Sequence, residues 1–302
     1  MNSVISVERL RKHYGKLEAV KDVSFEVREG EIFGLLGPNG AGKTTIVECL
    51  QGLRRYDGGK AMVLGFDPNT QADGLRRHIG SQLQESALPD RIKVWEALDL
   101  FASLSPVEAD WGKLIEQWGL SEKRNSSFGS LSGGQRQRLF VALALVNNPK
   151  LVFLDEMTTG LDPAARRVAW DLIKAIRERG ATVVLVTHFM EEAEALCDRL
   201  AIVDKGRIAA LDTPRGLVSC YAGDVRVVFS ADEAELGFLK DIDCVSRVER
   251  SGPRVTVYGK GPVLALTAAA LVSHGIVPAD LCLEQPSLED VFLNITGRAS
   301  HE

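Results

Sequence analysis

The sequence predicts an α/β domain with a mainly parallel sheet, followed by a small α+β domain. Three observations predict it. An apolar strand, a glycine-rich loop and a helix follow one another over residues 31–50, which is the start of a strand–helix alternation. Residues 151–215 continue that alternation, as in a parallel sheet covered by helices. Beyond Cys220 the pattern becomes βαββαβ, which is a ferredoxin-like order.

Apolar runs and breakers predict the elements of the first domain. They are, in order, antiparallel strands and turns at 1–30, a buried strand at 31–36, a helix at 45–50, strands near 60–64 and 79–83, a mostly helical segment at 85–150, buried strands at 151–154 and 182–187, and a hairpin at 203–208. Alternation and helical spacing predict the second domain in the same way. Its strands are expected at 224–230, 245–250, 254–258 and 280–283, and its helices at 232–239 and 263–274.

The glycine-rich loop carries the first chemistry. Residues 37–44 read Gly-Pro-Asn-Gly-Ala-Gly-Lys-Thr, and glycines at this spacing let backbone N–H groups turn inward around phosphate oxygens. Lys43 is a point charge for the β- and γ-phosphates, and the Thr44 hydroxyl is placed for Mg²⁺. The helix that follows adds its dipole toward an anion. The loop therefore predicts a site for ATP with Mg²⁺.

Two acids end the apolar run at 151–154. Ligands of parallel sheets sit at the carboxyl ends of the strands, so Asp155 is expected to hold Mg²⁺, usually through water. Glu156 then lies beside the γ-phosphate, where an attacking water must be positioned or deprotonated. An isolated pair of acids is more often two solvated side chains, but the upstream phosphate loop favours the catalytic interpretation.

A Ser-Gly-Gly-Gln segment begins a predicted helix between these two motifs. Ser132 is a good N-cap residue, and Gly133 and Gly134 leave room for a phosphate at the free N–H groups. Such a start alone is usually only a cap. In this order, however, the three motifs resemble those of the ATP-binding cassette (ABC) ATPases, which drive membrane transporters, and the resemblance covers roughly residues 4–215.

This resemblance implies a P-loop NTPase cassette with a RecA-like core, an antiparallel β subdomain and a helical subdomain at about 85–150. We therefore expect an ATPase domain at 1–219 and an accessory domain at 220–302. The resemblance also implies that residues 132–135 bind ATP held by the opposite subunit, so that hydrolysis needs a homodimer, or a heterodimer with a related ATPase.

The resemblance assigns further roles. Tyr14 matches the residue that stacks on adenine, Asp162 the loop at the dimer interface, and His188 the histidine that senses the γ-phosphate. Gln84 matches the glutamine that contacts Mg²⁺ and the water, although Gln82 lies close enough for a register error. The candidate nucleotide-binding residues are Tyr14, Gly37, Pro38, Asn39, Gly40, Ala41, Gly42, Lys43, Thr44, Thr45, Ser132, Gly133, Gly134, Gln135 and Asp162. The candidate metal ligands are Thr44, Gln84 and Asp155, and the candidate catalytic residues are Glu156, His188 and Gln84.

Two positions depart from the family pattern. Met157 stands where many members have Pro, and Thr159 stands where many have Ser. Neither change removes a catalytic group, so the departures bear only on the stiffness of that loop.

Composition excludes several classes of protein. The net charge of −5 argues against a dedicated nucleic-acid binder, and no nucleic-acid partner is expected. No apolar run reaches the roughly 20 residues that span a membrane, and the N-terminus lacks the features of a signal peptide. The five cysteines are scattered without a C-x-x-C pair, as expected of reduced thiols. We therefore expect a cytoplasmic protein, held at the inner face of the membrane by an integral-membrane permease.

The tail at residues 285–298 resembles the end of the daunorubicin-resistance-type branch of ABC exporters. The sequence thus predicts the ATPase subunit of an exporter. The alternatives are a non-transport ABC ATPase, regulatory or associated with nucleic acids, and a kinase on a similar core. Lys43 and Ser132 are too close for the long coiled coil of DNA-repair members, and one copy of each motif does not fit two-cassette translation factors. Residues 132–135 and the context of His188 argue against the kinase.

Overall fold

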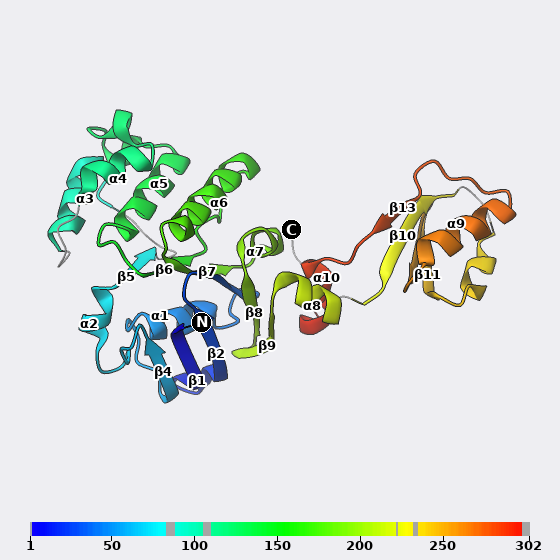
Figure 1. Cartoon of the computed structure of the whole chain (residues 1–302), viewed down its shortest axis with the longest axis horizontal. Coiled ribbons are helices and arrows are strands. Elements are labelled where there is room, and N and C mark those ends of the chain that lie inside the picture. The colour runs from blue at the N-terminus through cyan, green and yellow to red at the C-terminus, as the bar shows by residue number, and fades with distance from the viewer. Residues whose placement is uncertain (1, 83–87, 105–109, 222, 232–234, 298–302) are drawn as a thin grey trace. The chain divides into compact units, whose positions relative to one another are not determined.

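The computed structural model describes residues 2–82, 88–104, 110–221, 223–231 and 235–297. The chain divides into two compact units, residues 1–214 and 215–302, and each is described by itself (Figure 1). The division falls shortly before the boundary that we expect after residue 219.

A six-stranded sheet forms the centre of the first unit. The strand order is β5-β6-β7-β3-β8-β9, in which neighbours run parallel except β9, which is antiparallel to β8. Every residue of β3, β6 and β7 is buried, which explains why these segments are continuously apolar instead of alternating. The strands are β3 (Ile32–Leu36), β5 (Ile79–Gln82), β6 (Leu151–Asp155), β7 (Thr182–Thr187), β8 (Arg199–Asp204) and β9 (Arg207–Asp212).

A second, antiparallel sheet supports the first. It contains β1 (Ser3–Tyr14), β2 (Leu17–Arg28) and β4 (Gly58–Val63) in the order β2-β1-β4. Much of β1 and β2 alternates between buried and exposed residues, as expected where one face is covered. The two sheets share one hydrophobic core with helix α1 (Lys43–Leu50), and Phe25 of β2 stacks on Phe33 of β3 with ring centroids 5.3 Å apart.

Helices complete the first unit. In Figure 1, α3, α4 and α5 gather beside α6, away from β1, β2 and β4. Helices α3, α4 and α5 lie in residues 85–150, the segment that the sequence predicts to be mostly helical. The helices are α2 (Ala72–Arg76), α3 (Val94–Ser103), α4 (Trp111–Gln117), α5 (Gly133–Ala144), α6 (Pro163–Glu178) and α7 (Met190–Leu196), with short 3₁₀ turns at Ser121–Lys123 and Phe128–Ser130.

The second unit contains a four-stranded antiparallel sheet in the order β11-β12-β10-β13. This is the predicted ferredoxin-like order, because β12 lies between β10 and β11 and so splits the first βαβ unit. One prediction is partly wrong: a 3₁₀ turn at Gly237–Asp241 stands in the first crossover where an α-helix was expected, and residues 232–234 lie outside the described residues. The elements are α8 (Pro214–Tyr221), β10 (Val225–Ser230), β11 (Val245–Ser251), β12 (Arg254–Gly259), α9 (Val263–Ser273), β13 (Cys282–Glu284) and α10 (Leu288–Thr296).

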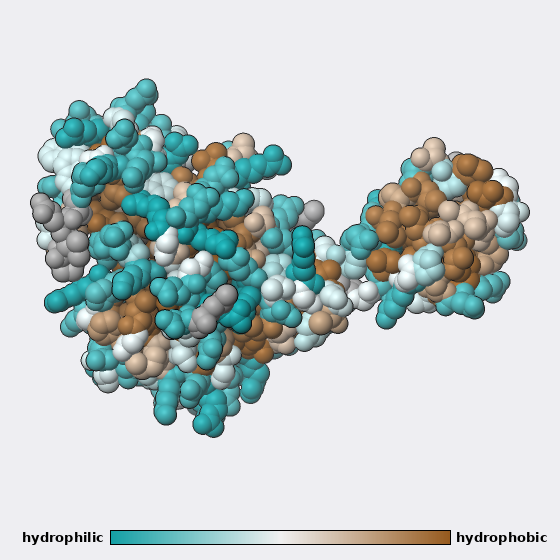
Figure 2. All heavy atoms as spheres, viewed as in Figure 1, coloured by the Kyte–Doolittle hydropathy of each residue, from teal (hydrophilic) through white to brown (hydrophobic). Residues whose placement is uncertain are grey.

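Helix α9 carries no charged residue. Its inner face packs Val263 and Leu271 into the core of the second unit, whereas Leu266 and Val272 are exposed. Figure 2 shows hydrophobic side chains gathered on this unit. Of the described helices, none has the length and apolarity needed to cross a membrane.

Candidate functional site: a nucleotide-binding edge

Strand pairing brings the phosphate loop and three further predicted site residues, Asp155, Glu156 and His188, to one edge of the six-stranded sheet. Strand β7 lies between β3 and β6, with Leu36 opposite Thr187 and Asp155 opposite Val186. The carboxyl ends of these parallel strands therefore lie side by side. Consequently the phosphate loop after β3, the two acids at the end of β6 and the histidine after β7 meet at this edge, which is where α/β sheets bind ligands.

The phosphate loop needs glycine where it approaches other backbone segments. A Cβ on Gly37 would lie 2.3 Å from the carbonyl oxygen of Val203, and one on Gly42 would lie 2.6 Å from that of Ala19. Gly42 also has a φ of +102°, which is unfavourable for residues with a Cβ. The loop can therefore follow this path ahead of α1 only with glycine at both positions.

Lys43 is held inside the loop. Its side chain is only 5% exposed, and Nζ donates hydrogen bonds to the carbonyl oxygens of Gly37 at 2.8 Å and Pro38 at 3.1 Å. Burial lowers the pKa of Lys43, whereas the nearby carboxylates of Glu156 and Asp155 raise it. The ammonium group is thus poised at the mouth of an anion site, and phosphate oxygens can replace its contacts to the loop.

Asp155 and Thr44 form a pair of oxygen donors. Asp155 is 2% exposed, and its burial raises the pKa of its carboxyl group to about 6, while the facing Thr44 hydroxyl lowers it. Among the described residues, Oδ1 of Asp155 has no hydrogen-bond partner. A buried carboxylate oxygen beside a hydroxyl fits Mg²⁺, which prefers oxygen ligands and binds through one or two carboxylates plus substrate phosphates. No cluster of three or more His, Cys, Asp or Glu side chains able to hold a metal occurs in the described part of the chain.

Glu156 and His188 lie next to each other. Oε1 of Glu156 is 3.4 Å from Nδ1 of His188 and 3.8 Å from Nζ of Lys43. The backbone of Glu156 has a φ of +49°, a left-handed conformation that costs a residue with a side chain of order 1 kcal/mol. Its N–H donates to the carbonyl oxygen of Val186 at 3.0 Å, which ties this backbone to the end of β7. The Glu156 carboxylate therefore lies within 4 Å of both the His188 imidazole and the Lys43 ammonium group.

A hollow of about 490 Å³ opens in front of these groups. Tyr14 forms part of its wall and is 39% exposed, so the aromatic ring is available to a ligand. Leu17 and Ala19 also line the hollow, and neither is predicted from the sequence, since small and aliphatic residues in a strand carry no signal of ligand contact. The lining residues are Tyr14, Leu17, Ala19, Asn39, Gly40, Ala41, Gly42, Lys43, Thr44, Thr45 and Glu156.

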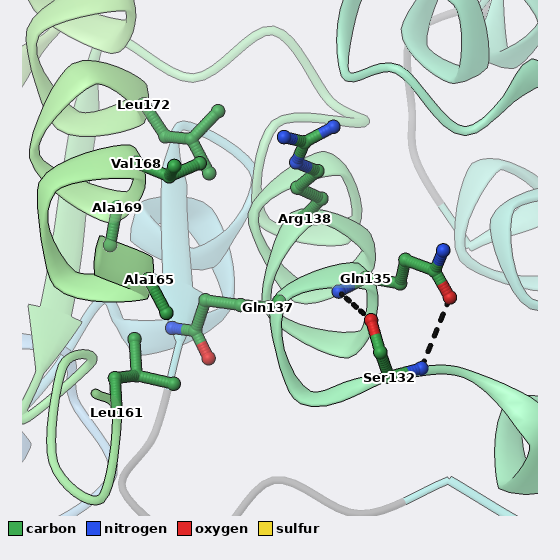
Figure 3. Close-up of a pocket in the computed structure, with 10 residues that line it drawn as sticks. Ser132, Gln135, Gln137, Arg138, Leu161, Ala165, Val168, Ala169 and Leu172 are labelled. Carbon is green, nitrogen blue, oxygen red and sulfur yellow. Dashed lines mark hydrogen bonds between the residues drawn. The ribbon is translucent and has the colours of Figure 1, made fainter. Parts of the chain in front are cut away.

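The signature motif, residues 131–135, is not part of this hollow. Ser132 caps α5 and forms a capping box with Gln135, in which each side chain accepts a hydrogen bond from the backbone of the other. Ser132, Gly134 and Gln135 instead line a separate hollow of about 260 Å³ between α5 and α6 (Figure 3). Within one chain, the signature motif and the phosphate loop therefore belong to two different surfaces.

The loop after Glu156 is well anchored despite the two departures from the family pattern. The side-chain amide of Gln137 in α5 donates to the carbonyl oxygen of Met157 at 2.7 Å. The backbone N–H of Thr159 donates to the carbonyl oxygen of Glu156 at 3.2 Å. Asp162 then caps α6, accepting from the N–H groups of Ala164 and Ala165 at 2.9 Å each. Sequence reasoning missed Gln137, whose role depends on a contact between distant segments.

Gln84 lies outside the described residues, whereas the alternative, Gln82, ends β5 and is buried. The role of Gln84 therefore stays a prediction.

The fold and this edge define a nucleoside-triphosphate-binding protein of the P-loop class. The family model described as "ABC transporter" matches residues 20–159. The chain is 38% identical to the daunorubicin resistance ATP-binding protein DrrA2 of Streptomyces coeruleorubidus, over 97% of this chain and 95% of that protein. It is 39% identical to the Nod factor export ATP-binding protein I of Ralstonia nicotianae, over 98% and 94%. The chain belongs to the ATP-binding subunits of ABC transporters, and it is an ATPase.

Solved structures agree with this assignment. A dimeric bacterial ABC transporter cassette is 27% identical and matches 69% of this chain and 98% of its own, with a TM-score of 0.63. An ATP-binding subunit of an ABC transporter is also 27% identical, matching 72% and 92%, with a TM-score of 0.65. The predicted cassette fold, the ATPase activity and the resemblance to the daunorubicin-resistance branch are confirmed, and the kinase alternative is set aside.

Proposed function

We propose that this chain drives export through a separate membrane permease, by closing a dimer of ATPase domains around two molecules of MgATP. ATP supplies the driving force through its different affinities for the open and closed states, because a ligand shifts an equilibrium only by its differential affinity. The observation that carries the proposal is the meeting of Lys43, Asp155, Glu156 and His188 at one sheet edge, with the signature motif on another surface.

The chain's own groups divide the work of hydrolysis. Lys43 and the inward N–H groups of the loop bind the phosphates. Glu156 orients the attacking water and accepts its proton, and His188, at 3.4 Å, responds to the γ-phosphate beside it. Thr44 and Asp155 are the residues that would hold Mg²⁺, which neutralises phosphate charge when bound. Tyr14 offers its ring to adenine.

A second subunit completes the site. Gly133 and Gly134 follow the Ser132 cap at the start of α5, where the backbone N–H groups of a helix favour an anion, yet residues 132–134 do not line the hollow of the phosphate loop. The proposal is that they close over ATP held by the other subunit, with Asp162 at the interface between the two. The dimeric cassette among the solved relatives supports this arrangement.

The direction of transport rests on the relatives. Curated proteins that match nearly the whole chain are named for daunorubicin resistance, doxorubicin resistance and Nod factor export, so we propose export of a small organic molecule. We further propose that the subunit works at the cytoplasmic face of the membrane, held there by its permease. The alternative is a non-transport role as a regulatory or nucleic-acid-associated ATPase.

Copurification tests this proposal. The full chain carrying an affinity tag, expressed with a candidate permease, should retain a polytopic membrane protein in mild detergent and fractionate with membranes. Its ATPase rate should respond to that permease in vesicles. Association with membranes that persists in cells lacking every candidate permease would contradict it. Retention of nucleic acid without any membrane protein would favour the alternative.

A further inference from the structure

A fully buried carboxylate lies behind the catalytic edge. Glu192 is in α7, four residues after His188, and is 0% exposed. It is not among the residues that line the hollow in front of the phosphate loop. Burial raises the pKa of its carboxyl group, and a buried acid is costly to a fold unless its partners compensate. The partners of Glu192 therefore indicate what the side chain does.

Those partners come from three separate segments. The indole N–H of Trp170 in α6 donates to Oε1 of Glu192 at 3.1 Å. The hydroxyls of Thr187 and Thr158 lie near the carboxylate and, with the charge of Arg166, favour its ionised form, although Oε2 of Glu192 and the Thr158 hydroxyl have no hydrogen-bond partner among the described residues. Because the Thr187 oxygen already accepts the N–H of the residue two positions on, at 3.0 Å, its own proton is free for the carboxylate.

Each partner belongs to a segment that also carries a residue of the ATP site. Thr158 is two positions after Glu156, Thr187 immediately precedes His188, and Trp170 belongs to the helix that Asp162 caps. The Glu192 carboxylate is therefore hydrogen-bonded to the helix behind the interface loop, and it lies near the hydroxyls of the loop after the base and of the strand that ends at the histidine. The left-handed backbone of Glu156 makes such support necessary, since strained conformations persist only where their surroundings over-determine them.

We propose that Glu192 is a positioning residue for ATP hydrolysis, whose carboxylate holds the loop after Glu156 against the end of β7 and so keeps Glu156 and His188 in register. The proposal rests on the role assigned to Glu156. It predicts an effect on turnover that is distinct from any effect on ATP affinity, because Lys43 and the phosphate loop remain untouched.

Two substitutions in the full chain test the proposal. Glu192→Ala should lower kcat for ATP hydrolysis about 10- to 100-fold, in line with the effect of a misplaced catalytic group, while the Kd for MgATP stays close to the wild-type value. Glu192→Gln keeps the volume and an acceptor for Trp170, so it should recover most of the lost kcat. Unfolding temperatures are measured alongside for all variants.

The chain offers a matched control. Glu31 is another largely buried carboxylate, 3.3 Å from Arg199, but it precedes β3 and so lies at the opposite end of that strand from the phosphate loop. Glu31→Ala should lower the unfolding temperature as Glu192→Ala does, yet leave kcat near the wild-type value. Equal losses of kcat in the two variants, or wild-type kcat in Glu192→Ala, would overturn the proposal.

Two further variants keep the test decisive. If Glu192→Ala does not fold, Trp170→Phe removes the N–H donor and keeps an aromatic ring; a kcat lowered at unchanged ATP affinity supports the proposal, and an unchanged kcat overturns it. Glu156→Gln is measured in parallel. Should that variant keep wild-type turnover, the assigned role of Glu156 fails on its own account, whatever the Glu192 variants show.

Discussion

At the scale of single residues, the sequence predicts the groups that we assign to ATP, Mg²⁺ and the attacking water, but not the groups that hold these side chains in place. Lys43, Thr44, Asp155 and Glu156 follow from motif spacing, since loop and strand-end chemistry is local. Glu192 and Gln137 carry no such signal. An acid in a short helix and an amide in the signature helix acquire their roles only when α7 and α5 pack beside the loop after β6, which depends on long-range contacts.

Replacing Glu156 by Gln should nearly abolish hydrolysis and preserve ATP binding. Gln can still hydrogen-bond in the same place, but its amide is not a base, and loss of a general base commonly costs 10²- to 10⁴-fold. Steady-state ATPase rates and nucleotide affinity measure the two effects separately. Turnover within twofold of the wild type would refute the assignment.

Asp155 should make the metal-free protein less stable as the pH rises. Its pKa is raised from 3.8 to about 6, so the folded chain binds more protons than the unfolded chain between these values. Stability therefore falls as pH rises through this window, by roughly 3 kcal/mol in total, and the loss persists at higher pH. Asp155→Asn should thus raise the free energy of unfolding, by more at pH 8 than at pH 5.

Urea unfolding without nucleotide or Mg²⁺ checks this expectation. The control is Asp73→Asn, because that side chain is 96% exposed and its replacement should change little at either pH. An equal gain from Asp155→Asn at both pH values would show that desolvation of this carboxylate is not the cause.

At the scale of elements, the buried strands could be predicted closely because a parallel strand covered on both faces leaves a continuous apolar run. The run at 182–187 matches β7 from end to end. The first crossover of the second unit was harder to predict, since a short segment of this kind can form a 3₁₀ turn as well as an α-helix. Long strands such as β1 (Ser3–Tyr14) were expected only as strands and turns, because bulges and register shifts interrupt their alternation.

The start of α5 provides a test of the composite site. Ser132→Arg should block hydrolysis while the variant's own Lys43 loop still binds nucleotide, because the bulky cation occupies the surface offered to the other subunit's ATP. Mixing it with a Lys43→Ala chain should restore at most one intact site per dimer. ATPase rates of the mixture, measured across mixing ratios, report this.

Loss of the cap is a separate effect, worth about 1 kcal/mol of stability. Ser132→Ala isolates it and should retain far more turnover than Ser132→Arg. A strictly monomeric form that hydrolyses ATP at the full rate would show that no second subunit is needed.

At the scale of the whole molecule, the ATP-site residues that could be placed lie within the first compact unit, between Tyr14 and His188. The change of pattern near Cys220 predicts a second domain there, and the chain divides into compact units at residues 1–214 and 215–302. The boundary itself was less certain, since α8 (Pro214–Tyr221) spans both the predicted and the observed division, and a helix gives no local sign of where one core ends.

Residues 1–219 should therefore bind MgATP without the rest of the chain. A companion fragment ending at residue 214 avoids cutting α8. A nucleotide-binding assay measures the ATP affinity of each fragment, and gel filtration shows whether the fragment aggregates. A fragment that stays in solution but does not bind ATP would contradict the domain boundary, whereas aggregation of both fragments would indicate that the second unit chiefly covers an apolar face of the first.

The left-handed backbone at Glu156 also constrains how this protein can change. Gly and Asn adopt that conformation with the least strain, so either substitution would raise the free energy of unfolding by relieving the backbone strain at this position. Neither can accept a proton from water. Selection for a more stable molecule therefore runs against selection for turnover at this position, and a lineage that no longer hydrolyses ATP would be free to lose the glutamate first.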